Sequence, residues 1–197
     1  MALDAQGGHP RDRRTIFRLG FKHLVEPVAE YLADRLNVQL PIVRAVLRPP
    51  GAVEERAFLA TCYRCGNCVD VCPARAIRVL STEDVQQAGT PYIDPDLAAC
   101  VVCDDLACIK ACPSGALKAV DRRSSIHMGL ARVNALVCVR RQGEACTLCV
   151  DKCPLGRQAI DLGQSGQVAV DTSGCVGCGV CQFYCPSQPK AVVVDPE

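Results

Sequence analysis

The sequence is poor in the side chains that usually fill a large protein core. Its 197 residues include no tryptophan, and only four tyrosines and four phenylalanines. A large aromatic core is therefore excluded, and a bound metal group is one way in which a small domain replaces it. No apolar run reaches the roughly 18 residues that a membrane-spanning helix needs, so we expect no transmembrane segment. A chain of this length forms one domain or two small ones.

The common signatures of an enzyme site are also missing. The sequence contains neither the glycine-rich fingerprint of a dinucleotide site nor a phosphate-binding P-loop. The formal net charge is only +1, and no feature indicates a nucleic-acid partner. We therefore expect neither catalytic residues nor binding to nucleic acid.

Cysteine is what the sequence has in abundance. All sixteen cysteines fall into four blocks, and each block ends in Cys-Pro. In chain order the blocks are Cys62, Cys65, Cys68 and Cys72; Cys100, Cys103, Cys108 and Cys112; Cys138, Cys146, Cys149 and Cys153; and Cys175, Cys178, Cys181 and Cys185. The first and last blocks read C-x2-C-x2-C-x3-C-P, the bacterial spacing for [4Fe-4S] ligation. Because a cubane takes one thiolate on each iron, the count predicts four [4Fe-4S] clusters in an electron carrier that is not an enzyme.

Two other uses of cysteine fit the sequence less well. A disulfide scaffold is typical of small secreted domains, and no secretory signal peptide is evident. A zinc-held structural module would need two Cys-x2-Cys knuckles or mixed ligands, and all three histidines lie outside the blocks. In the third block seven residues separate Cys138 from Cys146, which leaves open that Cys138 is a bystander. The total of four cysteines in every block favours a ligand role for Cys138.

The repeated blocks predict an α+β fold made of two ferredoxin-like 2[4Fe-4S] modules, or four half-ferredoxin repeats, over residues 49–197. Units of this kind cannot bury their apolar faces alone. We expect short helices after two Cys-Pro pairs, at residues 74–77 and 114–117, and strands at 92–93, 130–133, 168–170 and 191–194. In two-cluster ferredoxins the fourth cysteine of each motif binds the other cluster. The four motifs must therefore pair, either with their neighbours or in a nested scheme.

Residues 1–48 contain no cysteine and form a separate N-terminal extension. Apolar residues recur at helical spacing between Phe17 and Leu32, which predicts helices that pack on the cluster-binding body or dock on a membrane face through residues 14–36. The start of the extension, with Arg13 and Arg14, is similar to a twin-arginine export motif. The apolar segment that should follow such a motif is interrupted by charged residues.

Several short stretches around the blocks resemble the NapG/MauM-type ferredoxins. They are residues 47–52 (LRPPGA), 62–68 (CYRCGNC), 89–92 (GTPY) and 112–117 (CPSGAL), together with the long gap in the third block. The resemblance covers residues 47–197. It implies a four-cluster protein that passes electrons between a membrane quinol-oxidising partner and a redox enzyme, and it supports Cys138 as a ligand.

The second block is also similar to the iron-sulfur subunits of molybdopterin oxidoreductases, which are the alternative assignment. This similarity favours nested pairing, in which Cys112 would share a cluster with the third block. Cubanes are built where thiols stay reduced, so we expect assembly in the cytoplasm and a cytoplasmic protein, peripheral at the membrane. The alternative location is the periplasm, reached by twin-arginine export.

Overall fold

The computed structural model describes residues 46–197, which belong to one compact unit. The expected helices of residues 14–36 and the twin-arginine start lie outside this range. Leu47 and Arg48, which we expected to close the N-terminal extension, are both buried within the unit. No helix between residues 46 and 197 is long and apolar enough to cross a membrane.

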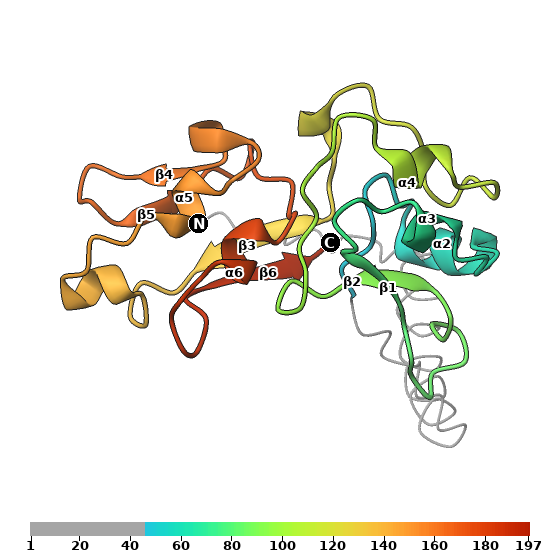
Figure 1. The fold of residues 1–197 in the computed structure, drawn as a ribbon, viewed down its shortest axis with the longest axis horizontal. Helices are drawn as coiled ribbons and strands as arrows, with labels where there is room; N and C mark the ends of the chain where they lie inside the picture. Colours follow the sequence, from blue (N-terminus) through green and yellow to red (C-terminus); the bar gives the residue numbers. More distant parts are fainter. Residues whose placement is uncertain (1–45) are drawn as a thin grey trace, which may run out of the picture. The chain divides into compact units, whose positions relative to one another are not determined.

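The unit consists of two halves built on the same plan, the first half (residues 46–121) and the second half (residues 122–197) (Figure 1). The first half contains α2 (Glu55–Thr61), α3 (Asn67–Asp70), β1 (Ile77–Val79), β2 (Pro91–Ile93) and α4 (Ala107–Lys110). The second half contains η1 (Arg123–Ser125), β3 (Gly129–Val133), η2 (Val139–Gln142), α5 (Leu148–Asp151), η3 (Gly156–Gln158), β4 (Ile160–Leu162), β5 (Val168–Val170), α6 (Val180–Phe183) and β6 (Val192–Pro196).

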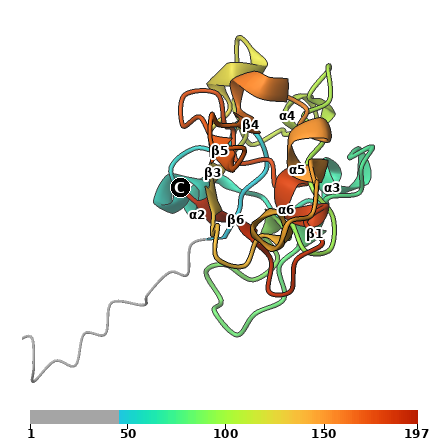
Figure 2. The same ribbon diagram turned by 90° about the vertical axis from the view of Figure 1, so that its left-hand side faces the viewer.

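In each half an antiparallel hairpin connects the two cysteine blocks. Strands β1 and β2 pair with Ile77 opposite Ile93, and β4 and β5 pair with Ile160 opposite Val170. The first half brings its two ends together through an isolated bridge between Ala52 and Leu117. The second half does so through the longer ladder of β3 and β6, which lie side by side in both views (Figures 1 and 2). The hairpin therefore returns the second block of each half to the side of the first.

Four helices of four residues each, α3, α4, α5 and α6, carry the third cysteine of a block at their second position. Three of them begin after a residue in the left-handed conformation, namely Gly66 (φ 81°), Leu106 (φ 44°) and Gly179 (φ 83°). The Cys-Pro pair that follows each of these helices prevents the helix from continuing, because proline has no N–H and disfavours helical geometry in the preceding residue.

The predicted helices at residues 74–77 and 114–117 are wrong. Both segments are turns, and the first leads directly into β1. Arg75 (φ 49°) and Gly115 (φ 74°) adopt the left-handed conformation and reverse the chain, which a helix cannot accommodate. The predicted strands lie within or at the start of β2, β3, β5 and β6. The helices α2 to α6, the 3-10 helices η1 to η3 and the strands β1 and β4 were not predicted.

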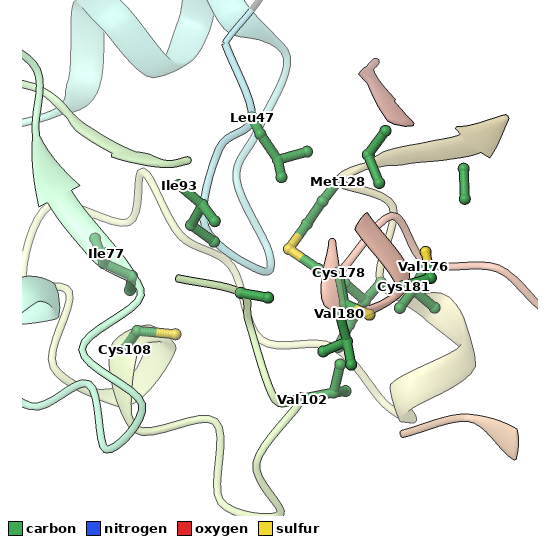
Figure 3. Packing of buried hydrophobic residues seen from close by; sticks show 14 of the residues in the cluster. Leu47, Ile77, Ile93, Val102, Cys108, Met128, Val176, Cys178, Val180 and Cys181 are labelled. Atoms are coloured by element: carbon green, nitrogen blue, oxygen red, sulfur yellow. The ribbon is translucent and has the colours of Figure 1, made fainter. Parts of the chain in front are cut away.

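One apolar core runs through both halves (Figure 3). Phe58 of the first half and Ile126 of the second are fully buried. Val102 of the first half and Val180 and Cys178 of the second half are members of this one cluster (Figure 3). Apart from Phe58 and Met128, this core consists of aliphatic side chains and the cysteines themselves.

Candidate metal centres

The structure gathers the cysteines into four groups of four. Three groups each surround a hollow of about 400, 360 and 340 Å³, volumes that include the open mouth. Set I is Cys62, Cys65, Cys68 and Cys112; set II is Cys72, Cys100, Cys103 and Cys108; set IV is Cys153, Cys175, Cys178 and Cys181. The remaining four form set III, which is Cys138, Cys146, Cys149 and Cys185. Every cysteine belongs to one set.

Packing and electrostatic repulsion both indicate that the four cysteines of set III lie close together. Cys138 and Cys185 are both buried and pack together around Ala191. Burial raises the pKa of Cys149 to about 11, and repulsion from the thiolates of Cys146, Cys138 and Cys185 adds to the effect. Cys138 therefore lies with the other three cysteines in spite of the long gap that separates it from Cys146.

The nested pairing that we preferred is wrong, because Cys112 lines the hollow of Cys62, Cys65 and Cys68 rather than joining the third block. Each block gives three cysteines to one set and its fourth cysteine to the other set of the same half. The physical reason is the hairpin between the two blocks of a half, which lays them against each other. A similarity in the sequence of one block contains no information about this long-range contact.

Backbone N–H groups point at the sulfur atoms. The N–H groups of Arg64 and Val102 donate to Cys62 Sγ and Cys100 Sγ, each over 3.4 Å. To do so, Arg64 (φ 54°) and Val102 (φ 49°) adopt the left-handed conformation, which is unusual for a β-branched residue such as valine. Similar bonds come from the residues that follow the Cys-Pro turns, namely Ala76 to Cys72, Leu117 to Cys112 and Ala191 to Cys185. Such bonds help to set the potential of an iron-sulfur group.

Burial makes several of the thiols resist ionisation. Burial raises the pKa of Cys68 and of Cys178 to about 12, and neighbouring thiolates add to the shift. At Cys112, burial opposes ionisation, but hydrogen bonds from the Ser114 hydroxyl and the Leu117 N–H outweigh it and lower the pKa. Holding four thiolates together therefore needs a positively charged partner, and metal binding must release protons.

Two arginine side chains anchor the cysteine loops to the hairpins. Arg140 Nε donates to the Gly166 carbonyl and Arg140 Nη1 to the Cys146 carbonyl, both over 2.8 Å. In the first half, Arg64 Nε donates to the Ala88 carbonyl over 3.0 Å and Arg64 Nη2 to the Gln86 carbonyl over 2.8 Å. The sequence analysis missed both arginines. The only signal for this role in the sequence is that each arginine lies within a cysteine block.

The arrangement fits a cluster better than a single ion. Between residues 46 and 197, no three or more Cys, His, Asp or Glu side chains converge as ligands of one metal ion do. In a cubane each thiolate binds a different iron, so the four sulfurs surround a group of atoms instead of meeting at one point. Hollows lined by four thiols have this form.

Comparison with known proteins agrees with the geometry. The family described as a 4Fe-4S dicluster domain matches residues 61–116. The methylamine utilization ferredoxin-type protein MauM of Methylophilus methylotrophus is 35% identical over 92% of this chain and 85% of its own length. The ferredoxin-type protein NapG of Escherichia coli is 37% identical over 76% of this chain and 70% of its own length.

A solved structure of the formate dehydrogenase–heterodisulfide reductase–formylmethanofuran dehydrogenase complex from Methanospirillum hungatei also contains a similar chain. The two chains are 24% identical over 70% of this chain and 50% of the other, with a TM-score of 0.29. A superposition this weak carries no argument about function. The dicluster family match and the mixed helix and strand arrangement are consistent with a ferredoxin-like fold.

Proposed function

Because the chain belongs to the family of the MauM and NapG ferredoxin-type proteins, which makes it an iron-sulfur electron-transfer protein, we propose that it relays electrons through four [4Fe-4S] clusters. The observation that carries the proposal is the grouping of sixteen cysteines into four sets of four, two sets in each half. Each set supplies the four thiolates that one cubane needs.

When bound, the clusters would supply one-electron chemistry, and the chain would supply their surroundings. The sixteen cysteines hold the iron as thiolates. The N–H groups of residues such as Arg64 and Val102 direct partial positive charge at the sulfurs, which stabilises added negative charge. Seven of the sixteen cysteines are buried, eight are partly buried and only Cys65 is exposed, so the chain limits the access of water to the clusters. No residue is assigned a catalytic role.

The proposed partners are proteins that give and take single electrons. A membrane quinol-oxidising protein is the proposed donor and a redox enzyme the proposed acceptor. The names of the relatives support a ferredoxin-type carrier, and one of them refers to methylamine utilization, whereas the quinol-oxidising donor is proposed from the family resemblance alone. A partner of this kind needs only to approach a cluster, so it requires no deep substrate pocket.

Anaerobic assembly followed by iron and sulfide analysis tests the proposal. We expect about sixteen iron and sixteen acid-labile sulfide atoms per chain, with a brown colour. Replacing Cys112 or Cys185 by Ala should remove one cluster from the first or second half, respectively, while the control Ser81→Ala, at an exposed position, keeps the full count. A wild-type count near eight of each, or a colourless protein that contains zinc, would overturn the four-cluster proposal.

A further inference from the structure

The two halves meet at the backbone of two cysteines. The N–H of Cys100 donates to the carbonyl oxygen of Cys178 over 3.0 Å. Cys100 belongs to set II and Cys178 to set IV, so one hydrogen bond joins a candidate ligand of the first half directly to a candidate ligand of the second.

Tight packing surrounds this bond. Val102, two residues after Cys100, is 1% exposed, and Val180, two residues after Cys178, is 5% exposed. Both valines belong to the apolar core that Figure 3 shows. Gly179 permits the approach, because a Cβ atom at this position would lie only 2.7 Å from the Cβ atom of Pro95 in the first half.

A side-chain bridge spans the same contact. Gln182 on α6 follows Cys181 of set IV and is only 6% exposed. Its Nε2 atom donates to Asp96 Oδ1 over 2.9 Å, and its Oε1 atom accepts the Val194 N–H over 2.8 Å. Asp96 lies in the first half, four residues before Cys100. A buried amide with both ends occupied holds a fixed orientation, so this bridge sets how the two halves meet.

We propose that electrons cross between the halves at the Cys100–Cys178 contact, which Gln182 and Asp96 hold in place, so that the four sites act in the order I, II, IV, III. This inference rests on the proposed electron-transfer function. Passage of one electron oxidises the iron held by one set and reduces the iron held by the other by the same one electron, with no proton or atom transferred. The external donor and acceptor are one-electron redox proteins, which would approach sets I and III. Cys65, the exposed cysteine, belongs to set I.

Electron paramagnetic resonance of the fully reduced protein tests the inference. The first variant is Asp96→Ala. Asp96 is exposed, so we expect the substitution to leave the fold and the iron count unchanged. We expect the magnetic splitting between clusters of the two halves to weaken and the transfer of electrons between halves to slow. Asp96→Asn keeps the accepting oxygen and should restore both. The exposed Gln164→Met serves as a control, and Gln182→Met as a second variant should act as Asp96→Ala does.

A double variant, with both Cys112 and Cys185 replaced by Ala, assigns the splitting to sets II and IV. Only these two sets keep four cysteines in this variant, so the remaining magnetic interaction must cross the junction between the halves. Absence of splitting in this chain with iron bound at both sets would overturn the inference, as would wild-type splitting and transfer rate in Asp96→Ala and Gln182→Met. Low iron in the wild-type protein would instead overturn the proposed function.

Discussion

The two halves bring their cysteines together through different spacings and different strand contacts. The first half has short spacings between its cysteines and closes its ends with the single bridge between Ala52 and Leu117. The second half has seven residues between Cys138 and Cys146 and closes with the five-residue ladder of β3 and β6. Both gather two sets of four thiols. The feature common to both halves is therefore the convergence of the thiols. The length of chain between two cysteines can vary when other contacts hold that segment in place.

The halves also differ in charge. The first half has ten acidic and seven basic side chains, and the second half has six acidic and eight basic ones. Two oxidised clusters with their thiolates would add about −4 to each half, so the difference of five charges persists in the loaded protein. Long-range fields steer encounters between proteins. The two halves are thus suited to partners of different charge.

The largest effect should come from the arginine that anchors the first half. Arg48 is 6% exposed, donates to Glu55, Thr90 and the Pro91 carbonyl, and lies over the ring of Phe58. Replacing it by Ala leaves the Glu55 carboxylate without its partner, so we expect the free energy of unfolding to fall by about 3 kcal/mol. The midpoint of anaerobic chemical denaturation measures this loss.

The second half supplies the control. Arg132 pairs with Asp195 across β3 and β6, and both side chains are largely exposed. Arg132→Ala should lower the free energy of unfolding by less than about 1 kcal/mol, since water screens exposed ion pairs. Equal losses in the two variants would contradict the importance that we assign to burial at Arg48.

Two glycines at equivalent positions allow a sharper comparison. Gly66 and Gly179 precede α3 and α6 in the same left-handed conformation, but a Cβ atom at Gly66 meets nothing within 4 Å, whereas one at Gly179 would press on Pro95. Either Ala variant incurs about 1 kcal/mol from backbone strain, and only Gly179→Ala adds a clash. Thermal denaturation of the two loaded variants should show the larger drop for Gly179→Ala. Identical drops would mean that the contact with Pro95 is loose.

The last of the three effects concerns the anchor of the third block and is measured as a rate of iron loss. Arg140→Ala removes two hydrogen bonds to carbonyls, while Arg141→Ala alters an exposed neighbour on the same 3-10 helix. We expect iron loss from set III to a chelator to accelerate roughly tenfold in the first variant, which corresponds to about 1.4 kcal/mol. If both variants lose iron at the wild-type rate, the long gap in the third block does not depend on Arg140.

Local features of the fold were predictable from the sequence, and long-range ones were not. The cysteine blocks and four of the strands follow from spacing and β-branched residues that need no distant partner. The helices at residues 74–77 and 114–117 were mispredicted because four residues are too few to reveal a helical period. The pairing of Cys112 and the bridge between Gln182 and Asp96 depend on contacts 44 and 86 residues apart in the chain, which no local pattern records.

Pairing of neighbouring blocks also has a consequence for biosynthesis. The last cysteine of the first half is Cys112, so both of its sets are complete before the ribosome has translated the second half. Domains generally fold as units, with the N-terminal one first during synthesis. The assembly machinery could therefore load the first half while residues 122–197 are still being added. A nested scheme would have kept Cys62, Cys65 and Cys68 waiting for Cys185, with reactive thiols exposed until the chain was finished.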